Sequence, residues 1–266
     1  MRSIGIVGCG AIGKAILRAA DTGVLDLEVA GVASRTEDTA REFLAGLDNP
    51  QPFMSTGELI EACDMVVEAA GAAVVPGLAT ATFDAGKDLM LISVGALIAH
   101  PEILDRSRET GCRLLMPSGA IVGLDGIKSA TMGVVDHVTM TSRKGPAALD
   151  GAPHVVNNNL DLWAMTEETE IFSGSAREAC VGFPANLNVS AAVSFAGIGP
   201  DRTTVKMVLV PELARNCHDI EVEGEFGLLR IHLENIPGEN PKTGRLTAMS
   251  IIRTLQQSLD PVHIGT

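Results

Sequence analysis

Aromatic side chains are scarce in this sequence. The 266 residues include no Tyr and one Trp, and aromatics make up 3% of the chain. Hydrophobic residues nevertheless make up 46%, which excludes a disordered chain and requires an interior filled by Ala, Val, Ile, Leu and Met. The length suits two modest domains or one large domain, with room for a substantial core.

Cysteine pairs and long apolar runs are also missing. The five Cys form no C-x-x-C pair and are odd in number, which argues against a disulfide framework or a zinc site and favours reduced thiols. No apolar run reaches the roughly 18 residues that a membrane span needs. The N-terminus opens into an expected strand, Ser3–Val7, with no basic leader. We therefore expect a cytoplasmic protein with no metal and no membrane partner.

Basic residues are outnumbered by acidic ones. The chain has 20 Lys and Arg against 33 Asp and Glu, a net charge of -13. Such an acidic protein repels phosphate backbones, so we expect no nucleic-acid partner. A small anionic substrate stays compatible with this charge, because a local basic pocket can sit in an acidic surface.

Short apolar runs alternate with helical periods over the first 120 residues. Strands are expected at Ser3–Val7, Leu27–Ala33, Met65–Ala69, Leu89–Val94 and Arg113–Met116. Helices are expected between them at Ala11–Thr22, Glu37–Ala45, Val74–Ala85 and Pro101–Thr110. This alternation indicates βαβ units and a parallel sheet of the Rossmann type, which makes the fold class α/β.

The pattern changes near Pro117. Strands with period-two alternation are expected at Val134–Arg143, Thr203–Val210, His218–Glu223 and Leu228–Leu233. Residues 224–227 read as a hairpin turn, Ala176–Ala196 as largely helical, and Gly145–Asp161 as loop. We predict a dinucleotide-binding domain at residues 1–118, completed by a closing helix at 243–258. Residues 119–242 then form a substrate and dimerisation domain, α+β with an antiparallel or mixed sheet.

A glycine turn follows the first strand and opens the first helix. In Gly8-Cys9-Gly10-Ala11-Ile12-Gly13, Gly8 permits the tight turn, Gly10 allows backbone approach to a pyrophosphate, and Gly13 allows close helix packing. The helix start offers free N–H groups, including those of Ala11 and Ile12, to phosphate oxygens. The motif alone is weak evidence, but its place between strand and helix predicts a nicotinamide dinucleotide, NAD or NADP.

The end of the second strand bears on which dinucleotide binds. NAD sites usually place an acid there for the ribose 2′-hydroxyl, whereas this strand leads into Ser34 and Arg35. Both side chains can bind a phosphate, so we expect use of NADP or of both cofactors, unless Arg35 is only a solvated loop charge. Small residues after the third strand, Ala70 and Gly71, would let the cofactor ribose lie close.

A dehydrogenase needs a proton acceptor near the reacting carbon. Of the six His, His218 begins a strand whose edge could face substrate, although a plain strand-edge histidine is the alternative. Arg143 and Lys144 end a strand and are a candidate carboxylate clamp, or an exposed charge pair. Asn186 and Asn188 lie beyond Pro184 and could cap a helix or face a ligand.

Together these motifs resemble the L-aspartate dehydrogenase family over nearly the whole chain. The segments that carry the resemblance are Met116–Asp125, Ser142–Pro146, Phe183–Asn188, Arg215–Ile220, Glu223–Gly227 and Asn240–Thr243. The resemblance implies NAD(P)-dependent oxidative deamination of a dicarboxylic amino acid, aspartate, to iminosuccinate and then oxaloacetate and ammonia, with the reverse amination. It also implies an active-site role for His218, cofactor contacts at Ala120 and Asn188, and a homodimer supported by the second sheet.

In the expected mechanism, hydride leaves the substrate α-carbon after its amine has lost a proton. His218, with an ordinary pKa near 6.5, can accept that proton or activate the water that attacks the imine. Asp219 points to the opposite face of the strand and is a poor candidate for orienting His218. The residues expected to hold the substrate carboxylates are Ser118, Lys144, Lys242 and Thr243.

Two other functions stay open from the residues. One is a different dehydrogenase of this architecture, acting on homoserine, a sugar or an inositol; these commonly use a Lys proton shuttle at a strand end, and none stands isolated there. The other is a dinucleotide sensor without catalysis, which would have lost the second-domain motifs that are intact here.

Overall fold

The computed structural model describes residues 3–184, 187–213, 215–236, 244–258, 260–262 and 264–265. The chain folds into two compact units. Unit 1 comprises residues 1–117 with 248–263, and unit 2 comprises residues 118–247 with 264–266. No helix among the described residues is long and apolar enough to cross a membrane.

Unit 1 contains a parallel sheet in the order β2-β1-β3-β4-β5. Its strands are β1 (Ser3–Val7), β2 (Glu28–Ala33), β3 (Met65–Glu68), β4 (Asp88–Leu91) and β5 (Leu114–Leu115). The central strands are buried on both faces, which explains why they appear in the sequence as continuous apolar runs rather than as alternation. The Rossmann-type fold expected from the sequence is confirmed.

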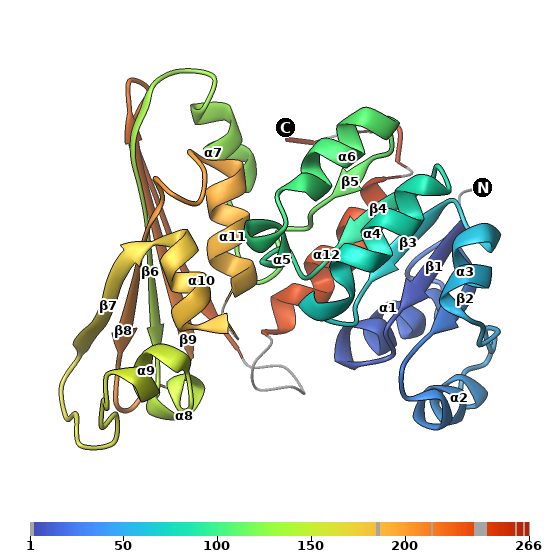
Figure 1. The fold of residues 1–266 in the computed structure, drawn as a ribbon, viewed down its shortest axis with the longest axis horizontal. Coiled ribbons are helices and arrows are strands. Elements are labelled where there is room, and N and C mark those ends of the chain that lie inside the picture. The colour runs from blue at the N-terminus through green and yellow to red at the C-terminus, as the bar shows by residue number, and fades with distance from the viewer. Residues whose placement is uncertain are drawn as a thin grey trace. The chain divides into compact units, whose positions relative to one another are not determined.

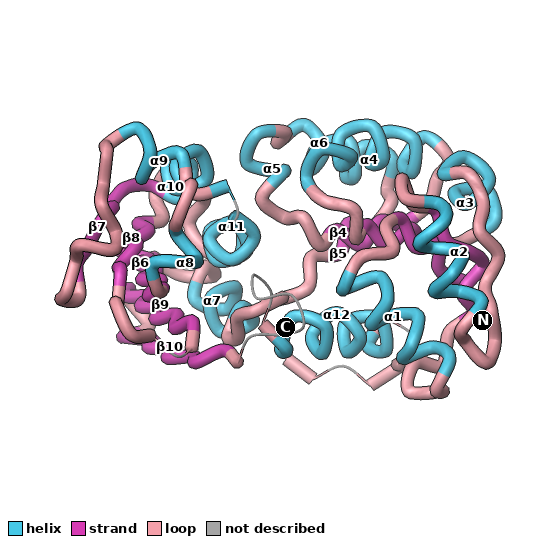
Figure 2. Tube along the Cα trace, turned by 90° about the horizontal axis from the view of Figure 1, so that it is seen from below, coloured by secondary structure: helices cyan, strands magenta, loops and turns pink. Residues whose placement is uncertain are grey.

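Helices cover both faces of this sheet, as Figure 2 shows. They are α1 (Ala11–Asp21), α2 (Glu37–Ala45), α3 (Thr56–Ala62), α4 (Val75–Asp84), α5 (Ala96–Ala99), α6 (Glu102–Thr110) and the C-terminal α12 (Arg245–Gln257), with a short 3-10 turn, η1, at Ala72–Val74. From α12, Ile251 and Leu255 are wholly buried in the same core as Ile16 and Leu17 of α1. The closing helix therefore completes the first core.

Unit 2 contains a mixed sheet in the order β10-β9-β6-β8-β7. Its strands are β6 (Val135–Lys144), β7 (Thr169–Ser175), β8 (Thr204–Leu209), β9 (Asn216–Gly224) and β10 (Gly227–Asn235). β6 runs parallel to β8, and the other pairs are antiparallel. The hairpin between β9 and β10 pairs Gly224 with Gly227, as its turn sequence predicts.

The described helices of unit 2 gather on one face of this sheet, and none of them lies on the opposite face, here called the outer face (Figure 1). They are α7 (Leu124–Ala130), α8 (Pro146–Leu149), α9 (Pro153–Asn157), α10 (Ala176–Gly182) and α11 (Leu187–Ala196). On the covered face, Met140 and Ile220 of the sheet pack with Ala192 and Val193 of α11 in one buried cluster.

Several local expectations were wrong. Residues 145–161 are not all loop, because Pro146 and Pro153 each start a short helix at a first-turn position, where the missing N–H costs nothing. The edge strand β7 was missed, and so were the short helices α3, α5 and α7. By contrast, the described part of 176–196 is largely helical as expected, and its two helices, α10 and α11, flank Pro184.

Candidate active site

The glycine turn joins β1 to α1 and cannot accept side chains at two positions. Gly8 has a φ of +109°, and a Cβ there would collide with the carbonyl of Ala69. A Cβ on Gly13 would collide with the carbonyl of Gly8. Gly10 is the N-cap of α1 and offers no side-chain acceptor to the first-turn amides of that helix. The turn is therefore a backbone cradle suited to an anion.

A cavity of about 690 Å³ opens beside this turn. Five residues predicted to bind cofactor line it, namely Gly8, Gly10, Ser34, Arg35 and Ala70. The segment Met54–Thr56 also lines it and was not singled out in the sequence. Four other residues predicted to bind cofactor do not line the cavity, namely Ala11, Ile12, Gly13 and Gly71.

The segment that follows β2, residues 34–36, lines the cavity and contains no acid. The Ser34 and Thr36 hydroxyl oxygens lie 3.5 Å apart, and both residues line the cavity. Arg35 is exposed and makes no hydrogen bond or ion pair within the described part of the chain. Two hydroxyls and an unpaired guanidinium form a group of phosphate donors, and the cradle and cavity together fit a dinucleotide.

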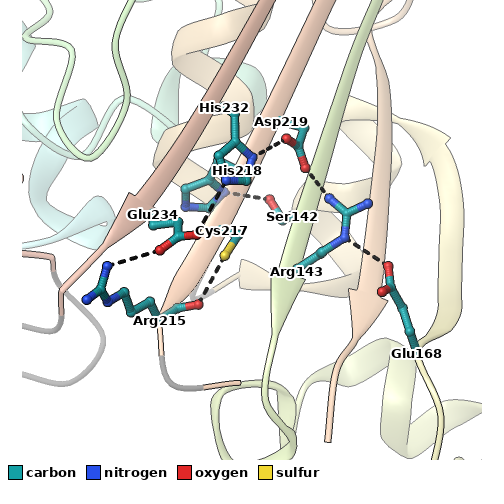
Figure 3. A network of polar contacts seen from close by, with 9 residues as sticks. All are labelled: Ser142, Arg143, Glu168, Arg215, Cys217, His218, Asp219, His232 and Glu234. Atoms are coloured by element: carbon teal, nitrogen blue, oxygen red, sulfur yellow. Dashed lines mark hydrogen bonds and ion pairs between the residues drawn. The ribbon is translucent and has the colours of Figure 1, made fainter. Parts of the chain in front are cut away.

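The second polar group lies in unit 2 on the covered face of the sheet, where β6 and β9 pair. The register places Ser142 directly opposite His218, and the Ser142 Oγ lies 3.0 Å from His218 Nδ1 (Figure 3). Ser142, Lys144 and His218 are all buried, with exposed fractions of 3%, 7% and 3%. Ser142 and Lys144 are two residues apart on one strand, so they share the face that His218 occupies.

Burial changes the ionisation of both titratable members of this group. Burial lowers the pKa of the Lys144 ammonium to about 8. Burial, and then the positive charge of Lys144, lower the pKa of the His218 imidazole to about 3. The Lys144 ammonium has no hydrogen-bond or ion-pair partner among the described residues. The group therefore holds a neutral imidazole beside a buried cation that lacks a counter-ion.

Arg143 does not join Lys144 in a carboxylate clamp, so that expectation was wrong. Strand alternation puts the Arg143 guanidinium on the outer face, where its Nε donates to Glu168 at 2.8 Å and its Nη1 pairs with Asp219 (Figure 3). Asp219 also lies 2.6 Å from Nδ1 of His232, an outer-face neighbour on β10. As expected, Asp219 is thus turned away from the hydrogen bond that orients His218.

Other predicted residues of unit 2 have different surroundings. Asn188 is an exposed residue in the first turn of α11. The Ala120 carbonyl accepts a hydrogen bond from the Asn235 side-chain amide at 2.7 Å, and Ser118 is half-buried. Lys242, Thr243 and Asn186 lie outside the described residues.

Sequence reasoning missed two polar residues that the structure brings forward. In the sequence, Ser142 stood out only as the first residue of a segment that carries the family resemblance, and Glu68 only as part of the strand expected at Met65–Ala69. Their partners, His218 and Ser93, are 76 and 25 residues away in the chain. A buried acid at the end of an apolar strand was the available signal for Glu68, because such a residue must find donors.

Comparison with known proteins gives matches for both parts of the chain. Residues 8–117 match the family described as homoserine dehydrogenase, NAD binding domain, and residues 125–258 match aspartate dehydrogenase, C-terminal. An L-aspartate dehydrogenase of Methanocella arvoryzae is 45% identical over 100% of both chains. An enzyme of Bordetella bronchiseptica, L-aspartate dehydrogenase 3, is 43% identical over 99% of this chain and 97% of its own.

Solved structures show the same architecture. The aspartate dehydrogenase of Thermotoga maritima superposes with a TM-score of 0.78 at 23% identity, with 100% of each chain covered. A homoserine dehydrogenase of Thiobacillus denitrificans gives a TM-score of 0.62 at 12% identity, covering 100% of this chain and 76% of its own. At these identities the superpositions establish the fold alone.

Proposed function

This chain belongs to the L-aspartate dehydrogenase family, and we propose that it oxidises L-aspartate with NAD(P), using His218 as the acid–base group. The observation that carries the residue assignment is the buried set of Ser142, Lys144 and His218 on one sheet face. We also propose that residues 1–118 with 243–258 act as the cofactor domain and residues 119–242 as the substrate domain.

Iminosuccinate forms when the substrate α-carbon loses a hydride and its amine loses a proton. A nicotinamide held beside the glycine turn would supply the hydride acceptor. The His218 imidazole, neutral because its pKa is far below physiological pH, accepts the proton. Water then adds to the imine carbon and forms a carbinolamine. Breakdown of the carbinolamine releases ammonia and leaves oxaloacetate. The Ser142 hydroxyl is hydrogen-bonded to Nδ1 of His218, so Nε2 is the nitrogen that exchanges protons with substrate.

Lys144 supplies the positive charge that a dicarboxylate requires. Its ammonium is buried and without an anionic partner in the described structure, so a substrate carboxylate would complete an otherwise incomplete ion pair. The same carboxylate would offset the charge that lowers the pKa of His218, and so make the imidazole a better base when substrate is present. Ser118, Lys242 and Thr243 complete the proposed substrate contacts, and Ala120 and Asn188 the proposed cofactor contacts.

The direct test follows the absorbance of reduced nicotinamide. Purified protein should reduce NAD or NADP with L-aspartate, and should oxidise the reduced cofactor with oxaloacetate plus ammonia. Homoserine and myo-inositol should support negligible turnover. Turnover with either of these and none with aspartate would replace the proposed substrate, whereas cofactor binding with no turnover on any of them would indicate a sensor.

We further propose a homodimer in the cytoplasm. None of the described helices of unit 2 covers the outer face of the mixed sheet, which leaves this face open to a second copy. Five unpaired Cys thiols are consistent with a reducing compartment. Light scattering on the purified protein should give twice the chain mass; a monomer mass would contradict the dimer.

A further inference from the structure

A wholly buried carboxylate stands at the end of β3. Glu68 is the last residue of this strand and has an exposed fraction of 0%. Its Oε1 accepts hydrogen bonds from the backbone N–H groups of Ala70 at 2.8 Å and Gly71 at 2.7 Å. Its two oxygens also accept from Ser93, Oε2 from the N–H at 2.8 Å and Oε1 from the hydroxyl at 3.1 Å. The carboxylate thus ties the segment after β3 to the segment after β4.

The segment that Glu68 holds is one wall of the dinucleotide cavity. Ala69 and Ala70 line the cavity, and the Ala69 N–H donates to the Val7 carbonyl at 2.7 Å. The Ala69 carbonyl lies so close to Gly8 that only glycine fits there. A shift of this segment would therefore be transmitted to the first residue of the glycine turn.

The hydrogen bonds also decide what this wall can offer a ligand. The N–H groups of Ala70 and Gly71 already donate to Glu68, so they are not free to bind a phosphate. Pyrophosphate binding is left to the first-turn amides of α1, and the Ala69–Gly71 wall is left to contact an uncharged part of the cofactor. Without Glu68, these two backbone donors would lose their buried acceptor, and the wall would lose the bonds that hold it in place.

We propose that Glu68 is a positioning residue for the dinucleotide: it fixes the wall of residues 69–71 against Gly8 by accepting hydrogen bonds from that wall's N–H groups. The proposal rests on NAD(P) use by this family but is independent of the role proposed for His218. It predicts that changes at Glu68 act on cofactor affinity and on the KM for cofactor more than on kcat.

The test is calorimetric titration of NADPH and NADH into Glu68→Gln. A glutamine has one acceptor oxygen, so it can serve the Ala70 and Gly71 donors or the Ser93 N–H, but not both. One buried donor then loses its partner, and we expect the Kd for both dinucleotides to rise about tenfold. The KM for cofactor should rise in parallel, with a smaller change in kcat.

Glu178→Gln is the matched control. Glu178 accepts hydrogen bonds from the Ser175 N–H at 2.7 Å and the Ser175 hydroxyl at 2.8 Å, but lies in unit 2 and does not line the cavity. Loss of the Glu178 carboxylate should affect the stability of the protein without changing the Kd for dinucleotide. Thermal melts of both variants separate an altered site from an unfolded protein.

Ser93→Ala provides a milder change, because it removes one hydroxyl from Glu68 and leaves the backbone bonds in place. Its Kd should rise about threefold, the effect of one modest hydrogen bond. A folded Glu68→Gln with wild-type Kd would overturn the proposal. If Glu68→Gln does not fold, an unchanged Kd in Ser93→Ala overturns it. Absence of dinucleotide binding by the wild-type protein would instead refute the proposed function.

Discussion

The cofactor cavity of unit 1 and the His218 group of unit 2 are built from different kinds of chemical group. The glycine turn beside the cavity is shaped by backbone and small residues, among them Gly8 and Gly10, and its anion donors are the peptide N–H groups that start α1. The His218 group is made of buried polar side chains, and burial lowers the pKa of two of them, Lys144 and His218. Backbone donors bind without changing protonation, whereas titratable groups can move a proton, so the difference separates holding a cofactor from performing chemistry.

The largest effect is expected at His218. His218→Ala removes the proposed proton acceptor and should lower kcat by roughly 10²–10⁴, the usual contribution of general acid–base catalysis. The Kd for dinucleotide should stay unchanged, because no residue that lines the cavity belongs to the His218 group. His137→Ala, an exposed histidine on β6, should keep wild-type kcat. A near-normal kcat in His218→Ala would show that His218 is not the proton acceptor.

Lys144→Met should raise the KM for aspartate by about 10², because a buried ion pair with a substrate carboxylate is lost. The affinity for dinucleotide should again be unchanged. A variant with raised cofactor Kd and unchanged KM for aspartate would reassign Lys144 to the cofactor.

The same variant makes a prediction for stability against pH. Burial depresses the pKa of Lys144 from 10.5 in the unfolded chain to about 8, so the unfolded state binds more protons between these values. The free energy of unfolding should therefore gain a contribution as pH rises from about 8 to 10.5. Below pH 8 the buried charge opposes folding. Denaturant titrations should show this gain in the wild type and its loss in Lys144→Met.

Gly8→Ala should damage the backbone cradle. The left-handed φ and the collision with the Ala69 carbonyl together should lower the free energy of unfolding by about 3 kcal/mol and weaken dinucleotide binding. Gly86→Ala is the matched control, since Gly86 also has a left-handed φ, +68°, but has open space around its Cβ position. It should cost about 1 kcal/mol and leave the Kd unchanged. Equal effects in both variants would mean that the turn is not specially constrained.

The smallest effect concerns the choice between dinucleotides. Arg35→Ala should raise the KM for NADP about tenfold while leaving that for NAD nearly unchanged, because the 2′-phosphate is the group that we expect the exposed guanidinium to bind. Arg41→Ala provides the control, since Arg41 already pairs with Glu37 and does not line the cavity. A strong wild-type preference for NAD would refute the proposed role of Arg35.

Much of unit 1 could be predicted because its signals are local. β1 and α2 begin and end where their apolar and helical patterns predict, and the glycine turn lies between strand and helix as its spacing requires. The helices that were missed, such as α5 and α7, are shorter than two full helical periods and leave little pattern to detect. β7 was missed because an edge strand needs only one partner and tolerates Gly and Ser in its sequence.

The sequence by itself determined the family and the glycine turn, and it named His218 as the candidate proton acceptor. These inferences depend on residue types at short spacings. Only the tertiary structure decided which neighbours act on these residues. Strand register brought Ser142 to His218, and the pleat sent Arg143 to the outer face while leaving Lys144 inside. Parallel pairing brought the segment after β4 to Glu68. These pairings lie tens of residues apart in the chain, and burial, which shifts the pKa values of His218 and Lys144, exists only once the sheet has packed against its helices.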